Sequence, residues 1–66
     1  MKLSQNEQNE ALDIARFVIE NGRVESGDGG FIDESLRTEV SYEAGERGYD
    51  DETAEAMATF ALEQYE

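Results

Sequence analysis

The chain has 66 residues, of which 17 are acidic and five are basic, so its formal net charge is −12 at pH 7. Such a charge repels DNA, RNA and anionic membranes, which argues against direct nucleic-acid binding and favours a basic protein partner. The chain contains neither Cys nor His, which excludes disulfides, thiolate nucleophiles, zinc–thiolate sites and the commonest general base.

This length is enough for one small domain, and we predict a single domain over residues 1–66. A domain of this size buries only about 60% of its unfolded surface, so it has room for a small core and no deep cleft. No apolar run approaches the roughly 20 residues of a membrane span, and the N-terminal segment lacks the apolar region of a signal peptide. We therefore expect a cytoplasmic protein.

The first predicted helix covers about residues 5–21. Ser4, followed three residues later by Glu7, forms a capping-box pattern at its start. Asn21 followed by Gly22 is typical of a helix C-terminus. The apolar residues at helical spacing predict the buried face, and they are Ala11, Leu12, Ile14, Ala15, Val18 and Ile19.

Residues 22–30 hold four of the six glycines, and we predict a flexible loop with turns there. The segment lacks the GxxxxGK[ST] pattern of a phosphate-binding loop. An EF-hand register that places Gly30 at position 6 puts glycines at two ligand positions and Leu36 where a bidentate acid is required. We therefore predict neither a phosphate cradle nor a metal site.

The segment from Phe31 to Glu46 is compatible with two structures. A short helix that is capped by Asp33 and ended by Gly45 or Gly48 is favoured by the spacing of its apolar residues. A strand over residues 31–43 is the alternative, because alternate positions are apolar and several residues prefer β structure. Those residues are Thr38, Val40 and Tyr42.

The stretch from Tyr49 to Glu66 is the best-defined helix of the chain. Asp50 or Asp51 is suited to cap its start, and the Tyr49 ring is placed to fold back on Ala54. We expect its apolar face to pack on the first helix. That face comprises Ala54, Met57, Ala58, Ala61, Leu62 and Tyr65. The predicted fold is mainly α, with two long helices and a short central helix; the alternative is α+β with residues 31–43 as a strand.

The negative charge is uneven along the chain, and this unevenness predicts a binding surface. Residues 33–66 contain eleven acids and two bases, a net charge of −9, whereas residues 1–32 have a net charge of −3. Acids one helical turn apart are separated by about 6 Å, which is on the scale of successive phosphates along a nucleic-acid strand. The candidate partner-binding residues are Glu39, Glu43, Glu46, Asp50, Asp51, Glu52 and Glu55, with support from Asp33, Glu34 and Glu63.

In size, acidity and lack of cysteine the chain resembles the DNA-mimic proteins of phages and mobile elements. These include anti-CRISPR proteins that occupy the DNA-binding surface of a type I CRISPR effector. The resemblance implies an inhibitor without enzymatic activity that acts in the host-cell cytoplasm and blocks a basic nucleic-acid-binding protein or complex. It covers overall size and charge, so it assigns no role to any single residue.

Two other functions fit the same sequence. One is an adaptor or antitoxin-like interaction module that uses an apolar groove beside Phe31, Tyr42 and Tyr49. The other is an acidic domain from a high-salt cytoplasm, whose charge serves solubility alone. An enzyme is not expected, because the chain offers no activated nucleophile or base. We also expect no cofactor.

Overall fold

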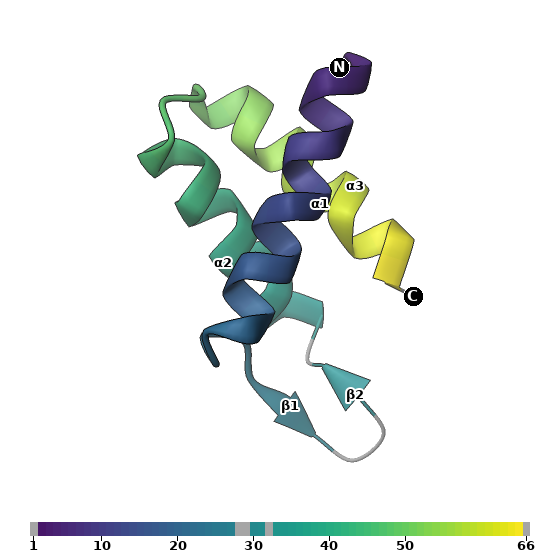
Figure 1. The fold of residues 1–66 in the computed structure, drawn as a ribbon, viewed down its shortest axis with the longest axis vertical. Coiled ribbons are helices and arrows are strands. Elements are labelled where there is room, and N and C mark those ends of the chain that lie inside the picture. The colour runs from purple at the N-terminus through teal and green to yellow at the C-terminus, as the bar shows by residue number, and fades with distance from the viewer. Residues whose placement is uncertain (1, 28–29, 32, 66) are drawn as a thin grey trace.

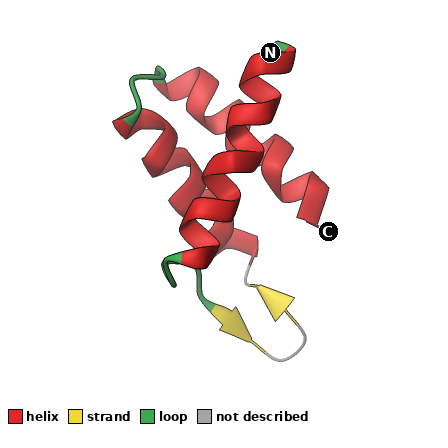
Figure 2. Cartoon of the chain, viewed as in Figure 1, coloured by secondary structure: helices red, strands yellow, loops and turns green. Residues whose placement is uncertain are grey.

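The computed structural model describes residues 2–27, 30–31 and 33–65. The chain forms three helices that pack into one body, with a small hairpin projecting at one end (Figures 1 and 2). The hairpin pairs Ser26 with Phe31 and Gly27 with Gly30 in antiparallel register. The elements in chain order are α1 (Gln5–Glu20), β1 (Ser26–Gly27), β2 (Gly30–Phe31), α2 (Asp33–Glu46) and α3 (Asp51–Tyr65).

The predicted mainly α fold is confirmed, but the predicted helix lengths are wrong. The helices α1, α2 and α3 have 16, 14 and 15 residues, so the central helix is not short. The strand alternative for residues 31–43 is also wrong, because residues 33–43 lie in α2, which is helical from Asp33 to Glu46. Leu36, Val40 and Ala44 share one face of α2 and are all buried. Packing of that face against the other helices outweighs the local β preference.

Side chains cap the starts of α1 and α3 as the sequence predicts. The Ser4 hydroxyl accepts the N–H of Glu7 at 3.1 Å, and the Glu7 carboxylate accepts the N–H of Ser4 at 2.8 Å. This is the complete capping box. At α3, the Asp50 carboxylate accepts the N–H of Thr53 at 2.8 Å, which identifies Asp50 as the N-cap residue. These bonds satisfy N–H groups that have no partner within the helix.

The C-terminus of α1 is closed by a glycine in the left-handed region. Gly22 has φ +68°, and its N–H donates to the carbonyl of Ile19 at 3.1 Å. The next N–H, from Arg23, donates to the carbonyl of Val18 at 3.0 Å. The two bonds form a Schellman motif. This motif ends α1 and positions Arg23 for the contacts described below.

The C-terminus of α2 repeats this arrangement and turns the chain into α3. Gly48 has φ +102° and donates to the carbonyl of Gly45 at 3.1 Å. Tyr49 donates to the carbonyl of Ala44 at 3.2 Å, which completes a second Schellman motif. The Tyr49 side chain is half-buried against the core cluster that also contains Ala54.

Gly48→Ala is expected to lower the free energy of unfolding by about 1 kcal/mol, because an L side chain is strained at positive φ. A Cβ at Gly48 would meet no atom within 4 Å, so the expected cost is conformational. Gly45→Ala is the matched control, because Gly45 lies within α2 and also has open space around it. The control should gain about 0.5–1 kcal/mol from helix propensity. Urea unfolding followed by circular dichroism measures the free energy of unfolding of both variants. Equal changes in the two variants would contradict a conformational requirement for glycine at position 48.

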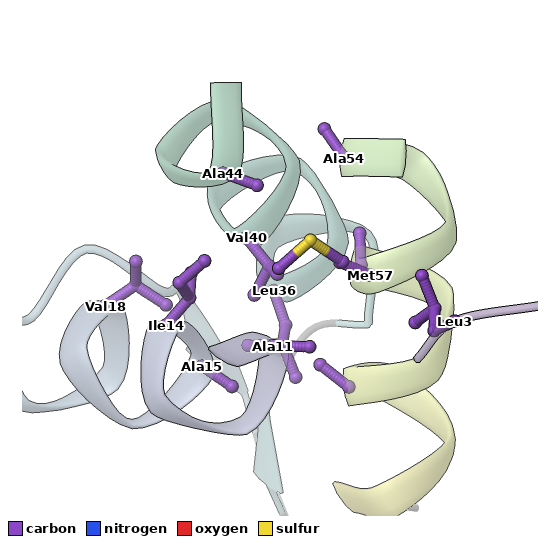
Figure 3. Packing of buried hydrophobic residues seen from close by; sticks show 12 residues of the cluster. Leu3, Ala11, Ile14, Ala15, Val18, Leu36, Val40, Ala44, Ala54 and Met57 are labelled. Atoms are coloured by element: carbon purple, nitrogen blue, oxygen red, sulfur yellow. The ribbon is translucent and has the colours of Figure 1, made fainter. Parts of the chain in front are cut away.

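The core lies where the three helices meet (Figure 3). Half of its twelve buried residues are alanines, which allow the helices to approach closely. The other six core residues are larger, and five of them are fully buried, namely Ile14, Val18, Leu36, Val40 and Met57, while Leu3 is 8% exposed. In α3 the predicted face is largely buried, except that Leu62 is half-buried and Tyr65 is exposed. The helix α3 packs against α2 as well as α1.

Within residues 2–27, 30–31 and 33–65, no helix has both the length and the apolar character needed to cross a membrane.

Candidate acidic interaction surface

The structure divides the seven predicted partner-binding acids into two groups. The first group, Glu39 and Glu43 on α2, is engaged with arginines inside the protein. Arg23 lies 2.9 Å from the Glu39 carboxylate and 3.0 Å from that of Glu43. Arg47 contacts the second oxygen of Glu43 at 3.3 Å and also pairs with Glu10 of α1. These five residues, which we call the arginine clamp, join α1 to α2.

Two aromatic rings lie against the arginine clamp. The guanidinium groups of Arg23 and Arg47 lie 6.0 and 5.7 Å from the centre of the Phe17 ring. Arg23 also lies 5.7 Å from the Tyr42 ring. Cation–π attraction therefore adds to the ion pairs between α1 and α2. It also accounts for the position of Phe17, which is large, apolar and 39% exposed.

Glu43 is the shared partner of both arginines. Its side chain is only 16% exposed. The hydrogen bond from Arg23 lowers the pKa of the Glu43 carboxyl below its usual value, the bond from Arg47 lowers it further, and burial opposes both. Glu43 is therefore held as a carboxylate by charges of the same protein. Its negative charge is largely compensated within the fold, and so is that of Glu39.

The second group lies where α2 turns into α3, and we call it the acidic corner. Glu46 is the last residue of α2, Asp50 caps α3, and Asp51 and Glu52 form the first turn of α3. Glu55 follows Asp51 by one helical turn. All five side chains are exposed. Hydrogen bonds from Thr53, first from its side chain and then from its backbone, lower the pKa of Asp50, so the cap is ionised at neutral pH.

The acidic corner has little positive charge near it in the sequence. Arg47 is the only base after residue 37, so α3 carries no Lys or Arg. Arg47 itself pairs with Glu10 and Glu43 of the clamp. Among the described residues, the one ion pair that an acid of the corner forms is that of Glu55 with Arg37 of α2, at 4.0 Å, with both side chains more than half exposed. Solvent screens such an exposed pair strongly.

Two shallow, open grooves lie beside α3. One, of about 430 Å³, runs between α2 and α3 and reaches Glu55 of the acidic corner. Its lining residues are Glu34, Arg37, Thr38, Ser41, Tyr42 and Glu55. The other, of about 420 Å³, lies between the N-terminal segment and α3 and includes Lys2, Leu3 and Phe60. In the part of the chain that the structure describes, no three acids are arranged to hold a metal ion.

The structure describes only some of the side chains that were predicted to line an apolar groove for an adaptor role. Tyr42 is 59% exposed beside Arg23, whereas Tyr49 is half-buried against the core. The side chain of Phe31 and the whole of Ile32 lie outside the described part of the structure. The supporting acids Asp33, Glu34 and Glu63 are all exposed, with Asp33 and Glu34 in the first turn of α2.

Comparison with protein-family models, curated proteins and solved structures finds no match to this chain. Its function must therefore be argued from its own surface.

Proposed function

We propose that this protein is a non-enzymatic binding protein that mimics the charge of a nucleic acid. In this proposal the acidic corner docks on a basic nucleic-acid-binding protein or complex, such as a CRISPR effector, and blocks that surface. The observation that supports this proposal best is that basic and acidic side chains are separated around the α2–α3 turn. Arg47, the only base between Glu46 and Glu55, pairs with Glu10 and Glu43, while the acids of the corner stay exposed.

The fold supports such a role because it fixes the acids before any partner arrives. Asp50 is hydrogen-bonded as a cap, and Asp51, Glu52 and Glu55 stand on a helix whose opposite face is buried in the core. A preorganised charged surface loses less entropy on binding than a flexible acidic tail. Its field also steers a basic partner toward the corner. In this proposal Glu39 and Glu43 do not contact the partner, and they stabilise the fold that holds the acidic corner through the arginine clamp.

The test is capture of a partner from a host-cell lysate at low salt by the immobilised protein. We expect the protein to retain nucleic-acid-binding proteins. Replacing Asp51, Glu52 and Glu55 by their amides should weaken this binding by roughly threefold to a hundredfold, since three exposed ion pairs of about 0.2–1 kcal/mol each are lost. The measurement is the affinity of the recovered protein for each variant.

The matched control replaces Asp13, Glu20 and Glu25 by their amides. These acids are exposed and form no ion pair with a described residue. Both variants have a net charge of −12 + 3 = −9, so only the position of the lost charge differs. Equal weakening in the two variants would contradict a localised surface. Salt-insensitive binding that is lost in Tyr42→Ala would instead favour the adaptor role, and no capture at all would favour a charge that serves solubility.

A further inference from the structure

Arg37 differs from the other arginines that form ion pairs in this fold. Its guanidinium lies 4.0 Å from the Glu55 carboxylate, and the two side chains are 55% and 69% exposed. In the arginine clamp, the contacts of Arg23 and of Arg47 with Glu43 are 3.3 Å or shorter, and no side chain there is more than 32% exposed. The Arg37–Glu55 pair is therefore loose and accessible to solvent.

The position of this pair connects it to the acidic corner. Arg37 of α2 and Glu55 of α3 both line the groove between these helices, together with Glu34 and Tyr42. Arg37 is the only base among the lining residues. Glu55 belongs both to the groove and to the acidic corner, so Arg37 holds a positive charge at the edge of the surface that the proposed function assigns to a basic partner.

We propose that Arg37 is an internal counter-charge that occupies Glu55 and limits the affinity of the acidic corner for basic partners. This inference rests on the proposed function and identifies a residue that regulates it. A lysine or arginine of the partner has to displace Arg37 from Glu55 and is repelled by it as it approaches. Because an exposed pair contributes little to folding, removing Arg37 should alter binding while leaving the fold intact.

The experiment measures binding of a fluorescein-labelled oligo-arginine peptide by fluorescence anisotropy at low salt. Arg37→Gln is compared with Arg16→Gln, and each variant has a net charge of −12 − 1 = −13. Arg16 is exposed on α1, pairs with no described acid and does not line the groove. We expect Arg37→Gln to bind the peptide about two- to fivefold more tightly than Arg16→Gln, since one charge at about 4 Å in water changes an equilibrium by about fivefold before screening.

A double-mutant cycle with Glu55→Gln distinguishes displacement of Arg37 from a general effect of charge. The advantage of Arg37→Gln should shrink in the Glu55→Gln background, because the competition for that carboxylate is gone. Equal affinities of the two arginine variants, or weaker binding by Arg37→Gln, would overturn the inference. Circular dichroism melts confirm that each variant is folded. The proposed function is tested separately, and it would be wrong if the wild-type protein captured no nucleic-acid-binding protein.

Discussion

Met57→Ala is expected to lower the free energy of unfolding by about 2–5 kcal/mol, which is the usual cost of truncating a large buried side chain. Met57 has no exposed surface and is among the few large residues of the core. Figure 3 shows its side chain extending from α3 toward Leu36 and Val40 of α2. The neighbouring core residues of α3 are alanines, so they cannot fill the space that Met57 leaves.

The effect should be close to the total stability of the domain. At roughly 0.05–0.15 kcal/mol per residue, a chain of this length is stable by only about 3–10 kcal/mol. Thermal and urea unfolding would show Met57→Ala to be partly or fully unfolded at 37 °C. Met57→Leu is the control, because a swap that nearly conserves volume costs less than about 1.5 kcal/mol. Similar stability of the wild type and Met57→Ala would contradict the described core.

Glu43→Gln is expected to destabilise the fold by about 1.5 kcal/mol at pH 7, the lower end for charged hydrogen bonds, because the clamp is partly exposed. The substitution removes the carboxylate that both Arg23 and Arg47 contact. The folded state lowers the pKa of Glu43, so its contribution is present above the pKa of the unfolded chain. That contribution is lost as the pH falls through the folded-state pKa.

The stability difference between the wild type and Glu43→Gln should therefore narrow as the pH is lowered from 7 to about 3. Chemical unfolding at a series of pH values measures this difference in the free energy of unfolding. Glu20→Gln provides the control, since it removes one exposed charge from α1 without touching the clamp. A difference that stays constant over this pH range would show that Glu43 does not act as an ionised clamp residue.

Local signals in the sequence were sufficient for most of the helix boundaries. Ser4 with Glu7, and Gly22 after Asn21, place the two ends of α1 because capping depends on residues within one turn. The central helix was ambiguous because Leu36 and Val40 lie at even spacing, which fits one face of a strand as well as one face of a helix. The helix is stabilised because this face is buried against α1 and α3, and that packing involves residues distant in the sequence.

The acidic region was also predictable from sequence, but its internal division was not. Counting charges was enough to find the excess of acids after residue 32. The engagement of Glu39 and Glu43 depends on Arg23, which is 16 and 20 residues away. No local pattern signals a contact of that separation. The structure is therefore what distinguishes the paired acids of the clamp from the exposed acids of the corner.

The most direct test of the central claim is competition between this protein and duplex DNA for a purified partner recovered by capture. If the acidic corner mimics a nucleic acid, binding of the protein and of DNA should be mutually exclusive. The affinity of the protein should also fall steeply as salt is raised from about 50 to 200 mM, because ion release drives the association. A ternary complex of partner, DNA and protein, with salt-insensitive affinity, would contradict the proposed function.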